Sequence, residues 1–291
     1  MRDNAAAGWQ VWWETIERGA QKVSDKIVEL AEIQPGDKVL DIATGMGEPA
    51  VTAAKIVMPD GKVVATDISP KMLQIARTRA TSLGLNGIME FRESDGEKID
   101  LSEQTIKFDA ILSRWGLMFF PNLPAALGSI RQLSSANGRL SAAVWSALPK
   151  VPLLGLAFAS VRKQINAPAP PPTTPGPFAL ADKEALKESF NQAGFKDIIT
   201  DTFQVTFEFD SPENYIRFHQ QNTAPIHAML ASHTEEVKKR AWNSITVAVW
   251  QYADSHGRVN LENEAICIVG KIEKEVGFCL QQLAFLMKCR L

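Results

Sequence analysis

Short apolar runs alternate with segments of helical periodicity between residues 37 and 145. Five of these runs have the length and apolar character of buried strands. They are Lys38–Ala43, Lys62–Asp67, Ile88–Arg92, Phe108–Ser113 and Arg139–Trp145. Helical spacing fills intervals between them, as in Pro49–Val57 and Leu123–Leu133, and Ser69 followed by Pro70 marks the start of another helix. Strands that alternate with helices predict an α/β fold with a doubly wound, mostly parallel sheet.

The second half of the chain continues this pattern with longer interruptions. Residues 181–194 form a predicted helix, and Ile198–Phe209 and Glu264–Ile272 are two predicted late strands. Residues 211–256, between those strands, have mainly helical spacing. The stretch Ala167–Phe178 is rich in proline, which fits neither a regular helix nor a strand ladder, so we expect a loop there.

Composition and charge argue against several classes of function. The 31 Lys and Arg residues are balanced by 33 Asp and Glu residues, so we expect no nucleic-acid partner. The most apolar stretch, Val151–Val161, is too short to cross a bilayer and contains Pro152. The first ten residues lack the pattern of a basic segment followed by an apolar one, so we expect no secretory signal. The three cysteines have no metal-ligand spacing. We therefore expect no integral membrane segment, no metal site and a cytoplasmic location.

A glycine-containing turn gives the strongest chemical signal. The strand that begins the pattern ends in a turn with Gly45 and Gly47, and a helix follows at once. Glycine lets the backbone bend sharply and approach a ligand closely. Asp67 ends the next strand, twenty residues after Gly47, where its carboxylate can accept hydrogen bonds from ribose hydroxyls. A turn residue before Ser69 is the alternative for Asp67, and the glycine pattern alone also fits a dinucleotide site.

An acidic segment follows the third predicted strand. It runs from Glu93 to Ile99, and a carboxylate at this position can accept a hydrogen bond from an adenine amino group. A solvated acidic loop is the alternative interpretation. Together with the glycine turn and Asp67, this segment indicates a cofactor that contains adenosine.

At these residues the chain resembles the ubiquinone/menaquinone-biosynthesis-type methyltransferases, which are class I (Rossmann-like) S-adenosylmethionine-dependent enzymes. The matching motifs are Asp41-x-x-x-Gly45-x-Gly47, Asp67-Ile-Ser-Pro-x-Met72-Leu, Ser94-Asp95-Gly96-Glu97, Phe108-Asp-Ala-Ile-Leu-Ser-Arg-Trp-Gly-Leu-Met-Phe-Phe120 and Gly138-Arg-Leu-x-x-x-Val-Trp145. The resemblance covers residues 35–147 with the late helix and strands. It implies a sheet of seven strands whose last strand is antiparallel, and S-adenosyl-L-methionine as the cofactor. The chain departs from the family at Pro49, where a third glycine is frequent nearby, and at Ala136-Asn-Gly138, where Pro-Gly-Gly is usual.

The resemblance also implies how the cofactor is held. Gly45 and Gly47 would border its methionine part, Asp67 its ribose, and Asp95 with Gly96 its adenine. The complete expected cofactor site consists of Asp41, Ala43, Gly45, Gly47, Asp67, Ile68, Met72, Asp95, Gly96, Glu97, Ser113 and Arg114.

The methyl acceptor is expected at the carboxyl end of the fourth predicted strand, near the point where strand order reverses. Arg114 lies there, and a buried guanidinium needs an anionic or carbonyl partner. That partner is the cofactor carboxylate, an acceptor oxygen or an internal carboxylate such as Asp41. Trp115 and Met118 follow as candidate walls of the pocket.

Trp9, Trp12, Trp13 and Ile16 form an apolar stripe on one predicted helix near the N-terminus. Such a stripe is commonly part of a core. The alternative is a lid whose indoles cover the cofactor and enclose the acceptor, and we therefore include the three tryptophans among the expected pocket residues.

Methyl transfer depends mainly on correct positioning of the nucleophile behind the methyl group. An oxygen or carbon acceptor also has to lose a proton, and His219 and His227 are the candidate general bases, with Tyr215 nearby in sequence. The alternative is that both histidines lie on the solvent side of the helical stretch.

The sequence thus predicts methyl transfer to an oxygen or carbon of a small, largely apolar or lipid-like organic acceptor by a monomer or homodimer. One alternative is an NAD-dependent oxidoreductase, although neither Tyr215 nor Tyr252 is followed by Lys four positions later, as a Tyr-x-x-x-Lys pair requires. A non-methylating protein that keeps the cofactor fold is the other alternative. The expected parts are an N-terminal helical lid (1–34), a Rossmann-like domain (35–147, 179–210 and 262–272), a Pro-rich loop (148–178), a helical cap insertion (211–261) and a tail helix (273–291).

Overall fold

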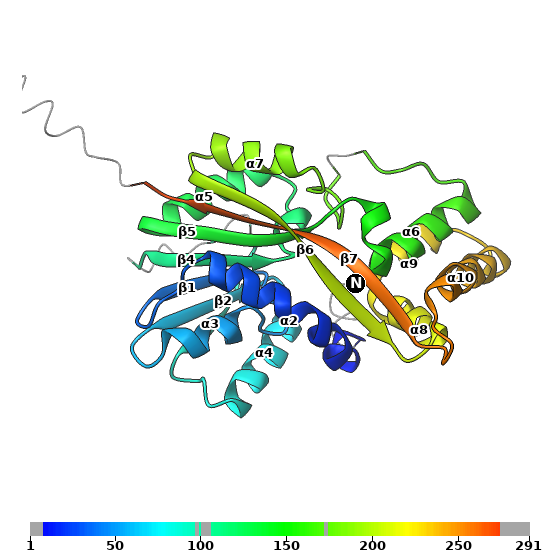
Figure 1. Ribbon diagram of the computed structural model, residues 1–291, viewed down its shortest axis with the longest axis horizontal. Coiled ribbons are helices and arrows are strands. Elements are labelled where there is room, and N and C mark those ends of the chain that lie inside the picture. Colours follow the sequence, from blue (N-terminus) through cyan, green and yellow to red (C-terminus); the bar gives the residue numbers. More distant parts are fainter. Residues whose placement is uncertain (1–7, 97–98, 100–105, 172–173, 274–291) are drawn as a thin grey trace, which may run out of the picture.

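The computed structural model describes residues 8–96, 99, 106–171 and 174–273, and Figure 1 shows how they are arranged. The strands are β1 (Lys38–Ile42), β2 (Lys62–Asp67), β3 (Met89–Glu93), β4 (Phe108–Arg114), β5 (Ser134–Trp145), β6 (Lys196–Phe209) and β7 (Val259–Lys271). The helices are α2 (Trp13–Leu30), α3 (Ala50–Val57), α4 (Pro70–Ser82), α5 (Leu123–Leu133), α6 (Pro152–Ile165), α7 (Lys183–Gln192), α8 (Pro212–Asn222), α9 (Ala224–Leu230) and α10 (Glu235–Val249). The expected tail helix lies, apart from Glu273, outside the described residues.

The strands form one seven-stranded sheet in the order β3-β2-β1-β4-β5-β7-β6. Strands β1 to β5 pair in parallel, and β7 is antiparallel to both of its neighbours. This arrangement confirms the predicted doubly wound, mostly parallel sheet with an antiparallel last strand. Chain order reverses between β1 and β4, so the carboxyl ends of these two strands border the crevice where open α/β sheets bind ligands.

Helices cover both faces of the sheet, which explains why its central strands read as continuous apolar runs. Successive side chains of a strand point to opposite faces. In β1, Val39 is buried in one cluster with residues of α3 and α4, whereas Leu40 is buried in another that includes residues of α5 and α7. No helix in the described part of the chain has the length and hydropathy of a membrane-spanning segment.

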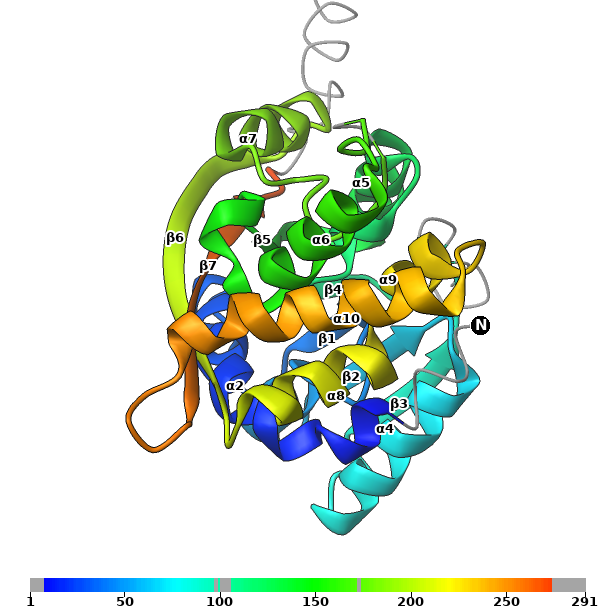
Figure 2. The ribbon, with the colours of Figure 1, turned by 90° about the vertical axis from the view of Figure 1, so that its right-hand side faces the viewer.

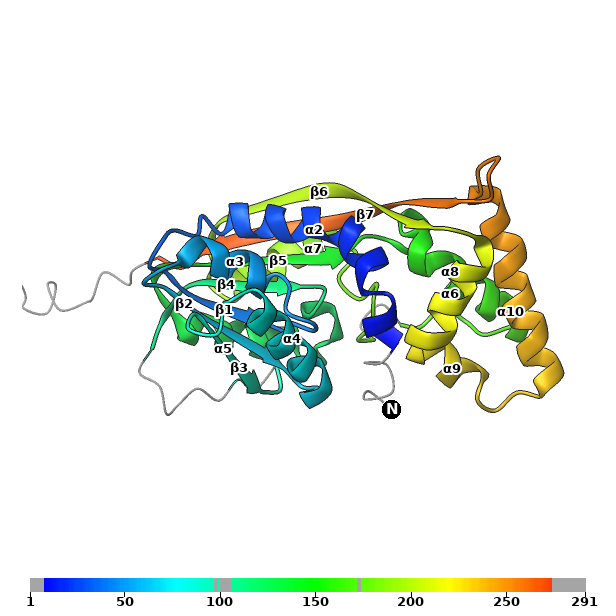
Figure 3. The same cartoon turned by 90° about the horizontal axis from the view of Figure 1, so that it is seen from below.

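Helices α6, α8, α9 and α10 form a cap beyond one end of the sheet, where β6 and β7 extend past the other strands (Figures 1 and 3). Strand β5 stops pairing with β7 at Trp145, opposite Ala265, while β6 and β7 stay paired as far as the cap. The hydroxyl of Tyr215 in α8 donates to the carbonyl of Leu153 in α6 at 3.0 Å, which holds two cap helices together. The cap therefore stands over the carboxyl ends of the parallel strands.

The structure corrects one expectation about this region. Residues 148–178 were expected to form a Pro-rich loop, but Pro152–Ile165 is the helix α6. Pro152 stands in its first turn, where the missing N–H of proline is not needed by the helix. Leu153, Ala157 and Val161 follow at helical spacing and are buried. The proline-rich stretch proper begins only after α6 ends.

Arg114, the last residue of β4, fixes α2 to the sheet. Its guanidinium forms a buried ion pair with Glu17 (Nη2 to Oε1, 2.6 Å) and donates to Ser24 Oγ at 2.8 Å and to the Ala20 carbonyl at 3.3 Å. Both side chains of the ion pair are 9% exposed. A charge buried to this extent is tolerated only with close partners, so Arg114 and Glu17 depend on each other.

We predict that Glu17→Ala lowers the free energy of unfolding by about 3 kcal/mol, because it leaves the Arg114 guanidinium buried without its counter-ion. Chemical denaturation followed by circular dichroism measures this change. The matched control is Glu14→Ala, an exposed position on the same helix, where we expect a change within about 0.5 kcal/mol. Equal losses in the two variants would contradict the anchoring role of the ion pair.

Candidate functional site

The glycine turn after β1 has an unusual backbone that leaves room for a ligand. Ala43, Gly45 and Gly47 all have positive φ angles, of 59°, 56° and 101°. A Cβ atom added to Gly45 would meet nothing within 4 Å, whereas one added to Gly47 would lie 3.4 Å from the Cβ of Ala76 in α4. Gly47 thus faces a neighbouring helix, and Gly45 faces open space.

Asp67 joins the glycine turn to the start of α4. Its Oδ2 accepts a hydrogen bond from the Gly45 N–H at 2.9 Å, and its Oδ1 accepts one from the Ser69 N–H at 2.9 Å. Ser69 in turn caps α4 by accepting from the Met72 N–H. These bonds hold a carboxylate at the end of β2 beside the turn, and they leave the next side chain, Ile68, 45% exposed.

Asp41 lies buried under the same turn and does not line the cavity described below. Its Oδ2 accepts a hydrogen bond from the Ala50 N–H, at the start of α3, at 3.1 Å. Burial raises the pKa of its carboxyl to about 7, against the opposing effects of the Thr44 hydroxyl and the Arg114 charge.

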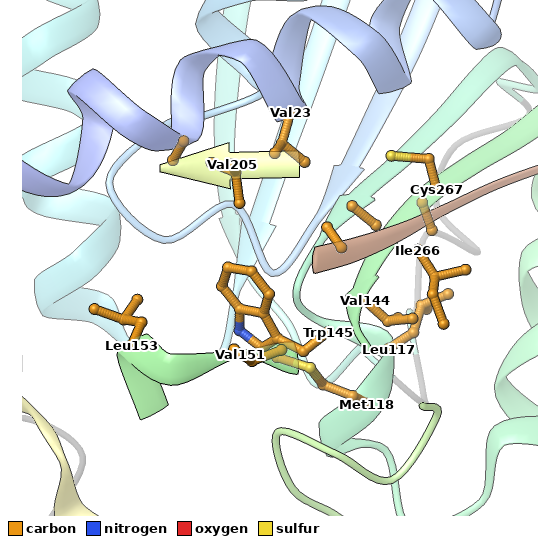
Figure 4. Close-up of a cluster of buried hydrophobic side chains, with 14 of the residues drawn as sticks. Val23, Leu117, Met118, Val144, Trp145, Val151, Leu153, Val205, Ile266 and Cys267 are labelled. Carbon is orange, nitrogen blue, oxygen red and sulfur yellow. The ribbon is translucent and has the colours of Figure 1, made fainter. Parts of the chain in front are cut away.

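A cavity of 290 Å³ extends from the glycine turn to the cap. The described residues around it come from the N-terminal segment, the turn, the end of β4, the late strands and the cap. They are Trp9, Trp13, Ile16, Glu17, Ala43, Thr44, Gly45, Met46, Glu48, Met72, Arg114, Trp115, Met118, Phe119, Trp145, Leu153, Leu154, Phe158, Pro177, Phe207, Phe218, Asn222, Thr223 and Pro225. Figure 4 shows part of this wall, with the Trp145 indole between Val205 and Met118.

Every charged side chain in the lining is paired within the protein. Arg114 binds Glu17, so the alternative partner Asp41 is not the one that it contacts. Glu48 pairs with Arg79 of α4 at 2.7 Å and is itself almost fully buried. The described wall of the cavity is consequently mostly apolar, and its charged groups are neutralised. Among the described residues, no His, Cys, Asp and Glu side chains gather in a group that could hold a metal ion.

The tryptophan stripe near the N-terminus divides between two roles. Trp9 and Trp13 line the cavity, and the Trp13 ring lies 4.3 Å from the guanidinium carbon of Arg79. Trp12 instead belongs to the core, packs on Phe218 of α8 and donates from Nε1 to Gln221 at 2.6 Å. Figures 2 and 3 show this first segment of the chain running beside α8.

The structure does not bring the two histidines to the cavity. His219 is fully buried, with Nε2 at 2.8 Å from the Leu153 carbonyl and Nδ1 at 2.8 Å from the Thr223 hydroxyl. Burial lowers its pKa to about 3, so it is neutral and both ring nitrogens are engaged. His227 is exposed and its Nε2 contacts the Gln220 carbonyl. His219 is thus enclosed by the cap, and only His227 lies on the solvent side.

The remaining expected cofactor residues lie at the ends of β3 and β4. Ser113 is buried and donates to the Ile42 carbonyl at 3.0 Å, which links β4 to β1. Asp95 is exposed just after β3. Gly96 follows it, and a Cβ there would lie 2.3 Å from the Phe120 ring, so a larger residue would have to displace that ring. Glu97 lies outside the described residues.

Sequence reasoning missed most of the cavity wall. Trp145 stacks on Trp115 with ring centroids 4.3 Å apart, and its place at the end of the strand next to β4 was a signal that could have identified it. Leu153 and Phe158 of α6, with Phe207 of β6, come from segments distant in sequence, and no local pattern points to them.

We predict that two buried groups make opposite contributions to the pH dependence of stability. Asp41 keeps its proton after folding, so its contribution is full below pH 3.8 and is lost as pH rises towards 7. His219 stays neutral after folding, so its contribution is full above pH 6.5 and is lost as pH falls towards 3. Each slope is about 1.4 kcal/mol per pH unit, and the two cancel between pH 4 and pH 6.

Urea denaturation at several pH values in this window tests the cancellation. Relative to the unmodified protein, His219→Gln should become less stable as pH rises, and Asp41→Asn less stable as pH falls. Two variants with the slope of the unmodified protein would show that neither group has the protonation state described here.

Comparison with known proteins identifies the family of the chain. Residues 33–194 match the family model described as a methyltransferase domain. A ubiquinone/menaquinone biosynthesis C-methyltransferase from Ectopseudomonas mendocina is 31% identical over 156 residues, which are 53% of this chain and 60% of that protein. The chain spans only 53% to 60% of the length of such curated relatives.

Solved structures share the fold at lower identity. A proposed methyltransferase from Bacillus halodurans C-125 superimposes with a TM-score of 0.56 and 19% identity, over 86% of this chain and 99% of that one. Phosphoethanolamine N-methyltransferase 2 from Haemonchus contortus, in complex with S-adenosyl-L-methionine, superimposes with a TM-score of 0.52 and 16% identity. The superposition covers 87% of this chain and 53% of that one. The family match covers more than half of the 291 residues, and the chain therefore belongs to the methyltransferase-domain family, as a class I S-adenosylmethionine-dependent methyltransferase.

Proposed function

We propose that this enzyme transfers the methyl group of S-adenosylmethionine to a carbon or oxygen of a small, largely apolar organic acceptor. The acceptor would occupy the cavity between the glycine turn and the cap. The relatives named as C-methyltransferases of quinone biosynthesis support an acceptor of this general kind. Because the chain spans only part of those relatives, the acceptor is inferred here from the cavity itself.

The residues around the glycine turn fit the cofactor. Gly45 faces open space, and the hydrogen bond between its N–H and Asp67 holds the turn and the carboxylate in a fixed relation. In this proposal the turn from Ala43 to Gly47 borders the methionine part, and Asp67 binds the ribose. Met72 and Ile68 pack beside the cofactor, and Asp95 with Gly96 lies at its adenine end. The bound cofactor supplies an electrophilic methyl group on a sulfonium.

The observation that supports the acceptor class best is the pairing of every charge in the cavity wall. Glu17 and Arg114 neutralise each other, and Glu48 is neutralised by Arg79. An acceptor with a carboxylate or phosphate would have to bury that charge without a free cation from the described lining residues, which is costly. Aromatic rings of the cap and of the N-terminal segment offer dispersion contacts to a planar apolar molecule instead.

The N-terminal segment acts as the lid of this chamber in our proposal. Trp9 contacts Phe218 in the cap edge to face, with centroids 5.8 Å apart, and Trp13 lies against Arg79 on the cofactor side. The segment thus spans the gap between the cap and the glycine turn. A chamber closed in this way excludes water from the sulfonium.

The cavity wall has no unpaired carboxylate and no histidine among its described residues. We therefore assign catalysis mainly to positioning, with the acceptor atom held behind the methyl group. The fitting acceptors are those whose nucleophilic form arises readily, such as phenols, quinols and activated carbon acids.

We predict that Asp67→Ala weakens cofactor binding by at least about tenfold, because it removes charge-assisted hydrogen bonds to the ribose and frees the glycine turn. Titration calorimetry with S-adenosylhomocysteine measures the change. Asp60→Ala, at an exposed position between α3 and β2, is the matched control and should bind normally. Unchanged affinity in Asp67→Ala would refute the assignment of the ribose site.

We predict that a screen with methyl-labelled cofactor shows transfer to uncharged phenols and quinols such as 1-naphthol. The matched control acceptor is 1-hydroxy-2-naphthoate, whose added carboxylate should lower turnover by at least about tenfold, since the part of the wall that the structure describes offers it no free cation. Preference for the charged acceptor, or transfer to nucleic acid without transfer to any small molecule, would contradict the proposal.

A further inference from the structure

Trp115 has a backbone conformation that a large side chain rarely adopts. Its φ angle is 60°, in the left-handed region, directly after β4. The surrounding backbone holds it there: its N–H donates to the Ala143 carbonyl at 2.8 Å. The next residue, Gly116, is packed so tightly that a Cβ would lie 2.7 Å from that of Ala43. This conformation places the indole in the wall of the cavity, next to the glycine turn.

Both the position and the charge environment of the ring are fixed. Trp115 stacks on Trp145 with an interplanar angle of 17°, and Phe207 flanks it with centroids 6.4 Å apart. The guanidinium carbon of Arg114 lies 5.1 Å from the ring centroid. A guanidinium at this distance is attracted to the face of the ring, which helps to hold the indole in place.

The indole N–H of Trp115 is buried and has no hydrogen-bond partner among the described residues. Buried tryptophan N–H groups normally have a partner, so an unpartnered one on a residue that lines a cavity points to a ligand that provides it. Asn222 also lines the cavity and has an unpartnered Oδ1. That oxygen, however, lies against the N-terminal segment, since a Cβ on Gly8 would be 2.6 Å from it.

We propose that the indole N–H of Trp115 donates a hydrogen bond to an oxygen of the methyl acceptor. This inference rests on the proposed function and narrows it: the enzyme selects planar, apolar molecules with a carbonyl or phenolic oxygen over hydrocarbons of the same shape. Contacts with the aromatic wall are non-directional. One hydrogen bond at the β4 end of the cavity would fix the orientation of the acceptor's ring within the cavity. Trp115 is therefore a positioning and specificity residue.

Two uncharged bicyclic probes separate this hydrogen bond from packing: 1-tetralone has a carbonyl oxygen, and tetralin lacks it. Their dissociation constants are measured by ligand-detected NMR with the full chain saturated with S-adenosylhomocysteine. Trp115→Phe removes the N–H and keeps an aromatic ring, and Trp145→Phe is the matched control in the same stack. We expect the preference for 1-tetralone over tetralin to fall about fivefold in Trp115→Phe and to persist in Trp145→Phe.

A second readout reports on the N–H itself. The indole ¹⁵N–¹H signal that is missing in Trp115→Phe should move downfield in the unmodified protein with 1-tetralone and stay in place with tetralin. Unchanged affinity of both variants for S-adenosylhomocysteine confirms that they are folded.

Three results would overturn the inference. If Trp115→Phe weakened the binding of both probes equally, the residue would contribute packing and no hydrogen bond. If the preference for 1-tetralone over tetralin were lost in Trp145→Phe instead, the donor would be the Trp145 indole. Both results leave the proposed acceptor class intact. Failure of either probe to bind any form of the protein would count against that class as well.

Discussion

The guanidinium of Arg114 connects the parts of the molecule on which the cavity depends. It ends β4 at the reversal point of the sheet, pairs with Glu17 and reaches Ser24 two turns further along α2. This one group fixes the helix that brings Trp9 and Trp13 to the cavity, and it lies over the ring of Trp115. Because its charge is paired with Glu17, Arg114 holds α2 in place and is not a free cation facing the cavity.

Charged side chains beside the glycine turn are also paired within the protein. Glu48 follows Gly47 directly, and its ion pair with Arg79 places a guanidinium against Trp13. The glycine turn, α4 and the N-terminal segment are thus joined by contacts between neighbouring side chains. A change at the turn is transmitted to the wall of the acceptor chamber through packed groups, with no long-range effect required.

The parts of the fold that the sequence predicted are those with a local signal. Strands buried on both faces read as apolar runs, and a turn that needs positive φ reads as Gly45 and Gly47. Helix α6 was missed because residues 148–178 were assigned as a whole to a Pro-rich loop, although the proline at its start is compatible with a first helical turn. Local signals of this kind also identified the turn and Asp67 as candidates.

The acceptor chamber had no such signal. Its wall combines residues from β4, β5, β6, α6 and α8, which only the folded chain brings together. The partner of Arg114 lies 97 positions away in sequence, so Glu17 was not among its expected partners. His219 was a reasonable candidate base by residue type, yet burial between α8 and α6 makes it a neutral link between helices.

The continuity of β6 and β7 restricts how molecules enter and leave. These strands run from the sheet into the cap without a break in their pairing beyond β5, and α8 begins three residues after β6 ends. A hinge between sheet and cap would have to break ladder hydrogen bonds along this two-stranded ribbon, so the cap does not swing as a separate body. The segment around Trp9 and Trp13 is held to the cap and to α4 by side-chain contacts, so our proposal assigns the opening of the chamber to it.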